Sequence, residues 1–310
     1  MDLKKECFLV TGAAGFVGSM LTRRLVKMGF KVHVLVSPQG DLWRIEDLLS
    51  SLTLHRGDIA DESFVRHLVG HINPSIIYHL ATHGAYSIQH DAKRILMTNV
   101  LGTFNLLAAL EHVPYKLFVN TGSSSEYGFK QKPMQENDLL EPNSYYAVAK
   151  AAQTMLSQYT ARSQKKPIVT FRLFSVYGPY EEPSRLVPTI ISRSLQGKDL
   201  EMVSPETARD FIYVEDVVDA YLSVERLLVC GDQIINIGRG QQVSLKEIVA
   251  VILVLTGSKA DVHWNAMQAR IWDTSIWVGE VRKAKELLNW HAATPLKEGL
   301  RLTMEWLNQR

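Results

Sequence analysis

Cysteine and long apolar runs are both scarce in this chain of 310 residues. The only two cysteines, Cys7 and Cys230, are too far apart in sequence to form a disulfide framework, which suits a reducing cytosol. The longest uninterrupted apolar stretch, 248–255, is much too short to span a bilayer. The N-terminus runs directly into a strand and shows no targeting segment. We therefore expect a cytoplasmic protein without a membrane partner.

An excess of either charge is also missing. Lys and Arg number 34 against 32 Asp and Glu, a formal net charge of +2, so no overall field attracts nucleic acid. Histidines 79, 83 and 90 lack the spacing of a metal-binding pair beside an acid, and we predict no metal. What remains is a globular chain, 46% hydrophobic, that is long enough for one large domain and a second, smaller one.

Short apolar runs alternate with helical patterns over the first 174 residues. The runs lie at 8–10, 32–36, 52–54, 75–80, 116–120 and 168–173, and a seventh follows at 233–237. This alternation predicts an α/β fold, a Rossmann-type doubly wound parallel sheet covered on both faces. After residue 174 the rhythm breaks into loops and further helices, which indicates a smaller, interleaved C-terminal lobe that binds the substrate. We assign 1–174 with 211–238 to the dinucleotide-binding domain, and 175–210 with 239–310 to the lobe.

A glycine-rich turn joins the first strand to the first helix at residues 12–18. Gly12 permits a tight turn, Gly15 lets the backbone approach a pyrophosphate, and Gly18 lets helix pack on strand. The helix start, with Phe16 and Val17, presents free N–H groups and a positive dipole end to the phosphates. The turn therefore predicts a dinucleotide cofactor.

Tyr146 and Lys150 lie four residues apart and share a face if this segment is a helix. An adjacent ammonium stabilises a phenolate, so we expect Lys150 to lower the pKa of Tyr146. The phenol then exchanges a proton with a hydroxyl while hydride moves to or from a nicotinamide. Tyr145 is the competing phenol.

Several ordered motifs together resemble the extended branch of the short-chain dehydrogenase/reductase superfamily, the NAD-dependent epimerase/dehydratase family. They are the G-x-x-G-x-x-G turn and the segments 57–59, 79–81, 99–103, 146–150, 172–179 and 209–216. The resemblance implies that Asp58 and Ile59 border the adenine, and that Leu80 and Ala81 line the nicotinamide-ribose channel. It also implies that Tyr146, and not Tyr145, is the catalytic phenol. It further implies that Lys150 binds the nicotinamide ribose and that Ser123 supplies the catalytic hydroxyl.

The cofactor is predicted to be NADP or NAD. Members that use NAD usually end the second strand with an acid that binds the ribose 2′-hydroxyl, whereas this strand ends at Val36 and is followed by Ser37. Ser37 with Arg44 would suit a 2′-phosphate, which favours NADP, while Arg44 as an ordinary surface residue leaves NAD open.

The residues after Ser123 separate the family's reactions. Dehydratases that resemble this chain carry an acid at the second position after the hydroxyl, where this chain has Ser125. Glu126 is one residue too far and would face the opposite way in an extended segment, and neither cysteine matches that of a double epimerase. The favoured reaction is reduction of a nucleotide-linked 4-keto-6-deoxyhexose at C4. The alternatives are a 4-epimerase with tightly bound NAD and a non-catalytic dinucleotide-sensing protein.

The resemblance also implies a nucleotide-diphosphate sugar as substrate. Arg209 and Arg270 would hold the diphosphate, because guanidinium forks bind two oxygens at once, and Asp273 would lie near the nucleoside ribose. Arg185 is a weaker candidate for the same diphosphate. Ser175 replaces the family's usual asparagine, and the remaining candidate contacts to the sugar are Ser124, His83 and Tyr86.

Family dimers pair two helices into a four-helix bundle, and the matching segments here are 91–111 and 145–162. We therefore expect a homodimer. Apolar side chains that fit such an interface, or simple packing on the sheet, are Leu106, Leu107, Leu110, Met155 and Leu156.

Overall fold

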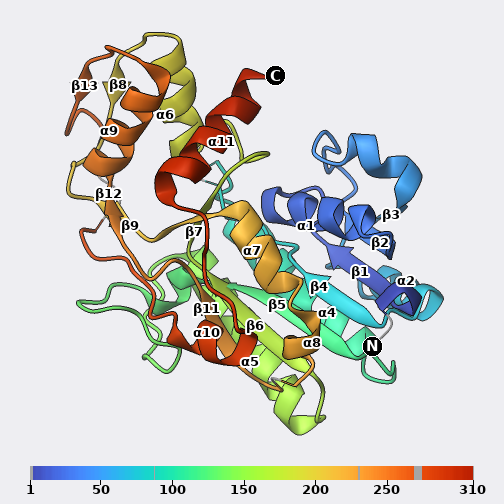
Figure 1. The fold of residues 1–310 in the computed structure, drawn as a ribbon. Helices are drawn as coiled ribbons and strands as arrows, with labels where there is room; N and C mark the ends of the chain where they lie inside the picture. The colour runs from blue at the N-terminus through green and yellow to red at the C-terminus, as the bar shows by residue number, and fades with distance from the viewer. Residues whose placement is uncertain (1–2, 87, 230, 269–273, 310) are drawn as a thin grey trace.

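A parallel sheet forms the centre of the computed structural model, which describes residues 3–86, 88–229, 231–268 and 274–309 (Figure 1). Its strands are β1 (Cys7–Thr11), β2 (Lys31–Val36), β3 (Thr53–Arg56), β4 (Ile76–His79), β5 (Leu117–Ser123), β6 (Ile168–Leu173) and β11 (Ile234–Ile237). They pair in the order β11-β6-β5-β4-β1-β2-β3, every pair parallel. The strand order runs outward in both directions from β1 and β4, where ligands bind in doubly wound folds. The predicted fold class is confirmed.

Helices cover both faces of the sheet. Phe8 and Val10 pack with α1 (Phe16–Lys27) and α7 (Val214–Tyr221) on one face. Leu9, between them, points to the other face, as the alternation of strand side chains requires. That second face is covered by α2 (Glu62–Ile72), α4 (Gly102–Ala109) and α5 (Tyr145–Ser163).

One predicted helix is interrupted in the structure. The segment expected at 91–111 consists of α3 (Ala92–Leu96), a π-helical turn η3 (Met97–Leu101) and α4. A short α8 (Val224–Leu227) follows the end of α7 at Tyr221. Asp91 caps α3 by accepting from the Arg94 N–H at 3.1 Å.

A third cluster of buried side chains comes mainly from residues beyond 175. It joins α6 (Leu186–Leu195), α9 (Leu245–Thr256) and α11 (Leu296–Asn308), which lie apart from the large sheet in Figure 1. The short strands of this part are β7 (Ser175–Tyr177), β8 (Leu200–Glu201), β9 (Ala208–Arg209), β10 (Phe211–Tyr213), β12 (Val243–Ser244) and β13 (Val262–His263). The other short elements are α10 (Arg282–Leu288), η1 (Leu3–Lys5), η2 (Glu46–Ser51) and η4 (Ser124–Tyr127). The division into two domains stays a prediction.

Asp210 connects several of these segments. Its buried carboxylate accepts hydrogen bonds from the backbone N–H groups of Arg239 at 2.8 Å, Gly240 at 3.0 Å and Gly279 at 3.2 Å. Burial raises the pKa of Asp210 to about 6. Across the described ranges, every helix falls short of the length and apolarity that a membrane crossing needs.

Candidate active site

The glycine turn lies directly against the end of β4. Gly12 has φ +72°, and a Cβ added there would lie 2.6 Å from the Ala81 nitrogen, so this position requires glycine. Thr11 Oγ1 accepts a hydrogen bond from the Ala81 N–H at 3.2 Å. The structure thus brings together the predicted phosphate turn and the predicted nicotinamide-ribose segment, Leu80 and Ala81.

The start of α1 is open to a phosphate. Gly15 occupies the N-cap position without a side-chain cap, so the N–H groups that begin with Phe16 and Val17 are not capped by a side chain. A Cβ at Gly18 would collide with the Gly12 carbonyl, so helix and turn pack closely only with glycine there. These features fit a bound dinucleotide pyrophosphate.

The predicted adenine contacts follow β3. The Asp58 carboxylate accepts from the Ala60 N–H at 3.0 Å and forms an ion pair with Arg94 at 3.1 Å. Ile59 is buried, and a Cβ at Gly102 would lie 2.6 Å from its Cγ2. Ser37 is exposed directly after β2.

Arg44, which was expected to support Ser37 in holding a 2′-phosphate, contacts other parts of the chain in the structure. Its side chain is buried, and its Nε donates to the Tyr180 carbonyl at 2.8 Å. Its Nη2 pairs with the Glu182 carboxylate at 3.0 Å, and the guanidinium lies 4.2 Å from the centre of the Trp43 ring. The charge of Arg44 is thus already compensated by a partner 138 residues away in sequence.

The three predicted catalytic residues converge at the carboxyl end of β5. The Ser123 hydroxyl lies beside the Tyr146 phenol and acts to lower its pKa. The buried Lys150 ammonium donates to the Thr121 carbonyl at 2.6 Å and to Gln153 Oε1 at 2.9 Å. Tyr145, the competing phenol, is 63% exposed at the start of α5.

The pKa of Tyr146 is raised in the structure, although Lys150 was expected to lower it. Burial raises the pKa of Tyr146, and the hydrogen bond with Ser123 and the charge of Arg185 offset part of that rise. Burial also lowers the pKa of Lys150 to about 8. The electrostatic support for a phenolate therefore comes from Ser123 and Arg185, while the lysine ammonium is bound to backbone and amide oxygens.

Glu126 is also placed differently from the expectation. It lies in the 3₁₀ turn η4 and not in an extended segment, and its carboxylate is fully buried. Glu126 Oε2 accepts from Arg172 Nε at 2.8 Å, and Oε1 accepts from the Ser123 N–H at 2.8 Å. The conclusion that Glu126 is not the acid of a dehydratase stays a prediction, now with a different physical reason.

The predicted substrate residues form a chain that leads away from Ser123. The indole N–H of Trp277 donates to the Ser124 hydroxyl at 3.1 Å, and the Arg209 guanidinium lies 5.2 Å from the centre of the Trp277 ring. Ser175 begins β7, where its N–H donates to the Asp210 carbonyl at 2.9 Å. Arg270 and Asp273 lie outside the described residues.

The loop after β4 borders Tyr146. A Cβ at Gly84 would lie 3.4 Å from Tyr146 Cδ2, in ordinary contact. The His83 N–H donates to Asn99 Oδ1 at 2.8 Å, and burial lowers the pKa of His83. His83 is therefore held by its backbone near the predicted reaction centre.

Glu181 is a buried titratable residue that the sequence analysis missed. Its Oε2 has no hydrogen-bond partner among the described residues, and Arg185 Nε lies 3.5 Å from Oε1. Burial raises the pKa of Glu181 to about 7. Arg185 Nη1 donates to the Ala85 carbonyl at 3.3 Å, which ties the loop after β7 to the loop after β4. The motif around Pro179 marked this loop, but nothing in the local pattern distinguished Glu181 from a surface acid.

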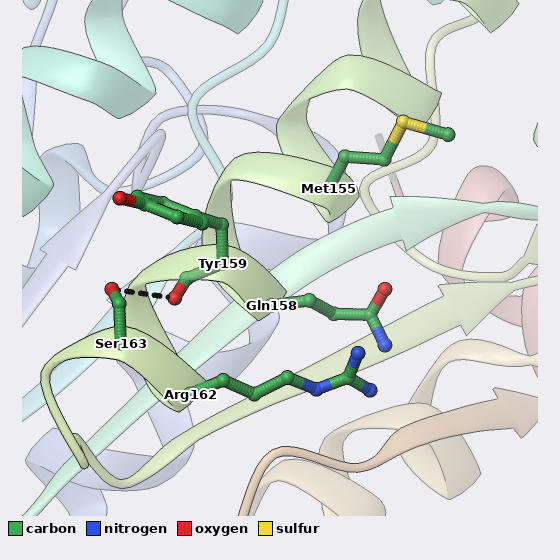
Figure 2. Close-up of a pocket in the computed structure, with 5 residues that line it drawn as sticks. All are labelled: Met155, Gln158, Tyr159, Arg162 and Ser163. Carbon is green, nitrogen blue, oxygen red and sulfur yellow. Dashed lines mark hydrogen bonds between the residues drawn. The ribbon is translucent and has the colours of Figure 1, made fainter.

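The outer face of α5 points away from these groups. Figure 2 shows Met155, Tyr159 and Arg162 projecting from the helix beside a shallow pocket. Met155 is 58% exposed and Tyr159 is 70% exposed. Four leucines proposed for a dimer interface pack against the sheet instead, three of them fully in the core: Leu106, Leu107 and Leu110, with Leu156 partly buried. Among the described residues, no three His, Cys, Asp or Glu side chains are grouped to hold a metal ion.

Comparison with known proteins agrees with this architecture. The model of the NAD dependent epimerase/dehydratase family matches residues 8–238. An uncharacterized UDP-glucose epimerase, YtcB of Bacillus subtilis, is 30% identical, with 97% of each chain covered. The UDP-glucose 4-epimerase of Thermotoga maritima, solved with UDP-glucose, has a TM-score of 0.89 and 27% identity over 98% of this chain and 99% of its own. MoeE5, solved with UDP-glucuronic acid and NAD, has a TM-score of 0.85 and 33% identity over 97% of this chain and 99% of its own.

Proposed function

Because the chain belongs to the NAD-dependent epimerase/dehydratase family, we propose that it is a nucleotide-sugar 4-epimerase that retains NAD. The observation that carries this proposal is the contact between Ser123 and Tyr146, with the nearest acid in sequence, Glu126, turned inward to Arg172. Such a site supplies one proton-transfer group and one hydroxyl donor at a single sugar carbon. That chemistry suffices for removing and returning hydride at C4, but not for expelling a hydroxyl group.

Each residue of the site has a definite part in this proposal. The phenol oxygen of Tyr146 takes the proton of the sugar C4 hydroxyl and later returns it. The Ser123 hydroxyl donates its one proton to that phenol oxygen before the transfer and to the sugar C4 oxygen after it, and Lys150 holds the nicotinamide ribose. When bound, NAD supplies the hydride acceptor. Gly12, Gly15 and Gly18 with the start of α1 would hold its pyrophosphate, and Asp58, Ile59, Leu80 and Ala81 would flank its two ends.

We propose NAD over NADP, reversing the preference drawn from sequence. The arginine that would neutralise a 2′-phosphate is already paired with Glu182. The bond from Arg44 to the Tyr180 carbonyl also ties the segment after β2 to the loop after β7, close to the glycine turn, since Arg44 Nη1 reaches the Ala14 carbonyl at 3.4 Å. A cofactor bound beneath this connection between the two segments would dissociate slowly, as an epimerase that retains NAD requires.

The substrate would extend from Ser123 along Ser124 and Trp277 toward Arg209, with the diphosphate at the arginine end and the hexose near His83 and Ser175. Arg270 and Asp273 remain proposed ligands of the diphosphate and the nucleoside ribose. UDP-glucose is the first substrate to test, because two of the relatives named above carry UDP-glucose epimerase in their names.

Reduction of a 4-keto-6-deoxyhexose is the second candidate. The observation that favours it is the absence of an acid at the end of β2, where exposed Ser37 gives a looser hold on the ribose than a carboxylate would. The third candidate is a dinucleotide sensor without catalysis. It gives no role to the contact between Ser123 and Tyr146.

We further propose a homodimer formed through α3, η3, α4 and α5. Exposed apolar side chains follow two helical stripes on this surface: Met97 and Phe104 on one, and Val148, Met155 and Tyr159 on the other. Their spacings are those of a single helix face, and a second copy of the same stripes is the simplest cover for them. This interface uses residues other than the core leucines.

The test is turnover by purified protein with UDP-glucose, without added cofactor and with added NAD. An epimerase forms the C4 epimer without net change in reduced nicotinamide. A reductase consumes one equivalent of NADPH with a nucleotide-linked 4-keto-6-deoxyhexose, and a sensor binds NAD but turns over neither. Tyr146→Phe should abolish turnover, whereas Tyr145→Phe, altered at the exposed neighbour, should keep it. Equal activity of Tyr146→Phe and wild type would contradict the proposed role of the phenol.

A further inference from the structure

Glu126 forms three hydrogen bonds with residues of three different elements. Its Oε1 accepts from the Ser123 N–H at 2.8 Å and from Thr154 Oγ1 at 3.1 Å, and its Oε2 accepts from Arg172 Nε at 2.8 Å. These partners stand at the end of β5, in the middle of α5 and in β6. A fully buried carboxylate with this set of donors is a rigid junction directly behind the reaction centre.

Gly122 leaves the space that this junction needs. A Cβ at Gly122 would lie 2.5 Å from Glu126 Oε1, closer than side-chain atoms approach one another. The residue before the catalytic serine must therefore be glycine if the glutamate is to fold back onto the Ser123 N–H. Gly122 and Glu126 are matched in shape, although neither touches the Tyr146 phenol.

The junction holds the Ser123 side chain in place. Ser123 Oγ accepts from the Ser125 N–H at 3.1 Å, and the Ser123 and Glu126 side chains form a reciprocal capping box around η4. The hydroxyl keeps its proton and a second lone pair for Tyr146, which lies beside it on α5.

Charge gives Glu126 a second connection to the site. Its carboxylate raises the pKa of Lys150, against the lowering by burial, and it raises the pKa of Tyr146 together with Tyr86. Arg185 and the hydrogen bond with Ser123 act on Tyr146 in the opposite direction. Arg172 faces the carboxylate from β6 and compensates its charge.

We propose that Glu126 is a positioning residue for the reaction, holding Ser123 so that its hydroxyl donates to the Tyr146 phenol oxygen. Only the expected kinetic effects of this proposal rest on the proposed function. Glu126 transfers no proton to the substrate, because Arg172, Thr154 and the Ser123 N–H occupy it.

Two variants of equal charge separate positioning from electrostatics. Glu126→Gln keeps an acceptor oxygen for the Ser123 N–H, and Glu126→Met removes it. We expect kcat of Glu126→Met to be about 100-fold below that of Glu126→Gln, as for a misplaced catalytic group, with KM within about twofold. Equal kcat values in the two variants, both folded by circular dichroism and thermal unfolding, would overturn the proposal.

A cofactor-free measurement keeps this result distinct from failure of the proposed function. The pKa of Tyr146 is followed by NMR of protein carrying carbon-13 at the tyrosine ring carbon bonded to oxygen, with Tyr146→Phe identifying the signal. We expect a pKa about one unit higher in Glu126→Met than in Glu126→Gln, because only the former loses the hydrogen bond from Ser123. Identical pKa values would overturn the positioning role even if no sugar substrate is ever found.

Gly122→Ala serves where Glu126→Met fails to fold. The added Cβ displaces the carboxylate while every charge stays, so the pKa of Tyr146 should rise above the wild-type value and kcat should fall. Thr154→Val is the matched control, because it removes one hydrogen bond to the same oxygen but leaves the bond to Ser123. An unchanged pKa of Tyr146 in Gly122→Ala would contradict the proposal. An equal rise of that pKa in Thr154→Val would also contradict it.

Discussion

Arg44 and Glu182 form an ion pair at 3.0 Å that joins the segment after β2 to the loop after β7. This pair, with the bond from Arg44 to the Tyr180 carbonyl, engages the arginine that was expected to support Ser37. A 2′-phosphate bound by Arg44 would therefore have to break an existing charge pair before it gained a new one.

The first prediction concerns cofactor choice. We expect NAD to bind at least about tenfold more tightly than NADP, a difference of about 1.4 kcal/mol, in isothermal titration calorimetry of cofactor-stripped protein. Ser37→Asp should widen the difference, because a carboxylate accepts from the ribose 2′-hydroxyl and repels a 2′-phosphate. Tighter binding of NADP to the wild-type protein would show that Arg44 leaves Glu182 to meet the ligand.

The second prediction concerns the glycine turn. Gly12→Ala places a Cβ 2.6 Å from the Ala81 nitrogen in a backbone with φ +72°. The left-handed conformation alone costs about 1–2 kcal/mol for alanine, and the collision adds to it. We expect a lower melting temperature and loss of NAD binding, whereas Gly29→Ala, with open space around its Cβ, should keep NAD binding despite its own positive φ. Normal NAD affinity in Gly12→Ala would contradict the assigned cradle.

The third prediction concerns the oligomeric state. Met155→Glu introduces a charge into the exposed stripe of α5, and we expect the variant to sediment as a monomer at concentrations where the wild type is a dimer. Val254→Glu is the control, because Val254 is 74% exposed on α9, outside the stripe. A monomeric wild type, or a dimeric Met155→Glu protein, would contradict this interface.

The fourth prediction concerns pH-dependent stability. The pKa of Glu181 is raised by burial from 4.5 to about 7, so the folded state holds this proton more tightly than the unfolded state. Its contribution to stability is fully present below pH 4.5 and is lost as the pH rises through about 7. At about 1.4 kcal/mol per pKa unit, Glu181→Gln should be more stable than wild type by roughly 3–4 kcal/mol above pH 7. Denaturant unfolding at acidic and alkaline pH measures this difference, and parallel pH profiles for the two proteins would contradict it.

Local patterns in the sequence predicted most of the fold. The strands appear as short apolar runs because both faces of the sheet are covered. The glycine turn can be recognised in the sequence because Gly12 needs a positive φ, which other residues rarely adopt. The position of Ser123 beside Tyr146 followed from family spacing, and in the structure Ser123 acts to lower the pKa of Tyr146.

The differences from expectation come from two contacts between residues distant in sequence and from one local turn. Arg44 resembled a free cation because Glu182 and the Tyr180 carbonyl come from another part of the chain. Lys150 was expected to act on Tyr146, but its ammonium turns to the Thr121 carbonyl. Glu126 was expected in an extended segment, and the 3₁₀ turn that reverses its direction depends on its own bond to the Ser123 N–H.

The central claim, reversible hydride removal at C4 by a site built on Ser123 and Tyr146, is tested most directly with UDP-glucose deuterated at C4. We expect the C4 epimer to form with its deuterium retained, without net accumulation of reduced nicotinamide and without turnover in Tyr146→Phe. Loss of the deuterium to solvent, or stoichiometric consumption of a reduced cofactor in forming product, would contradict the account.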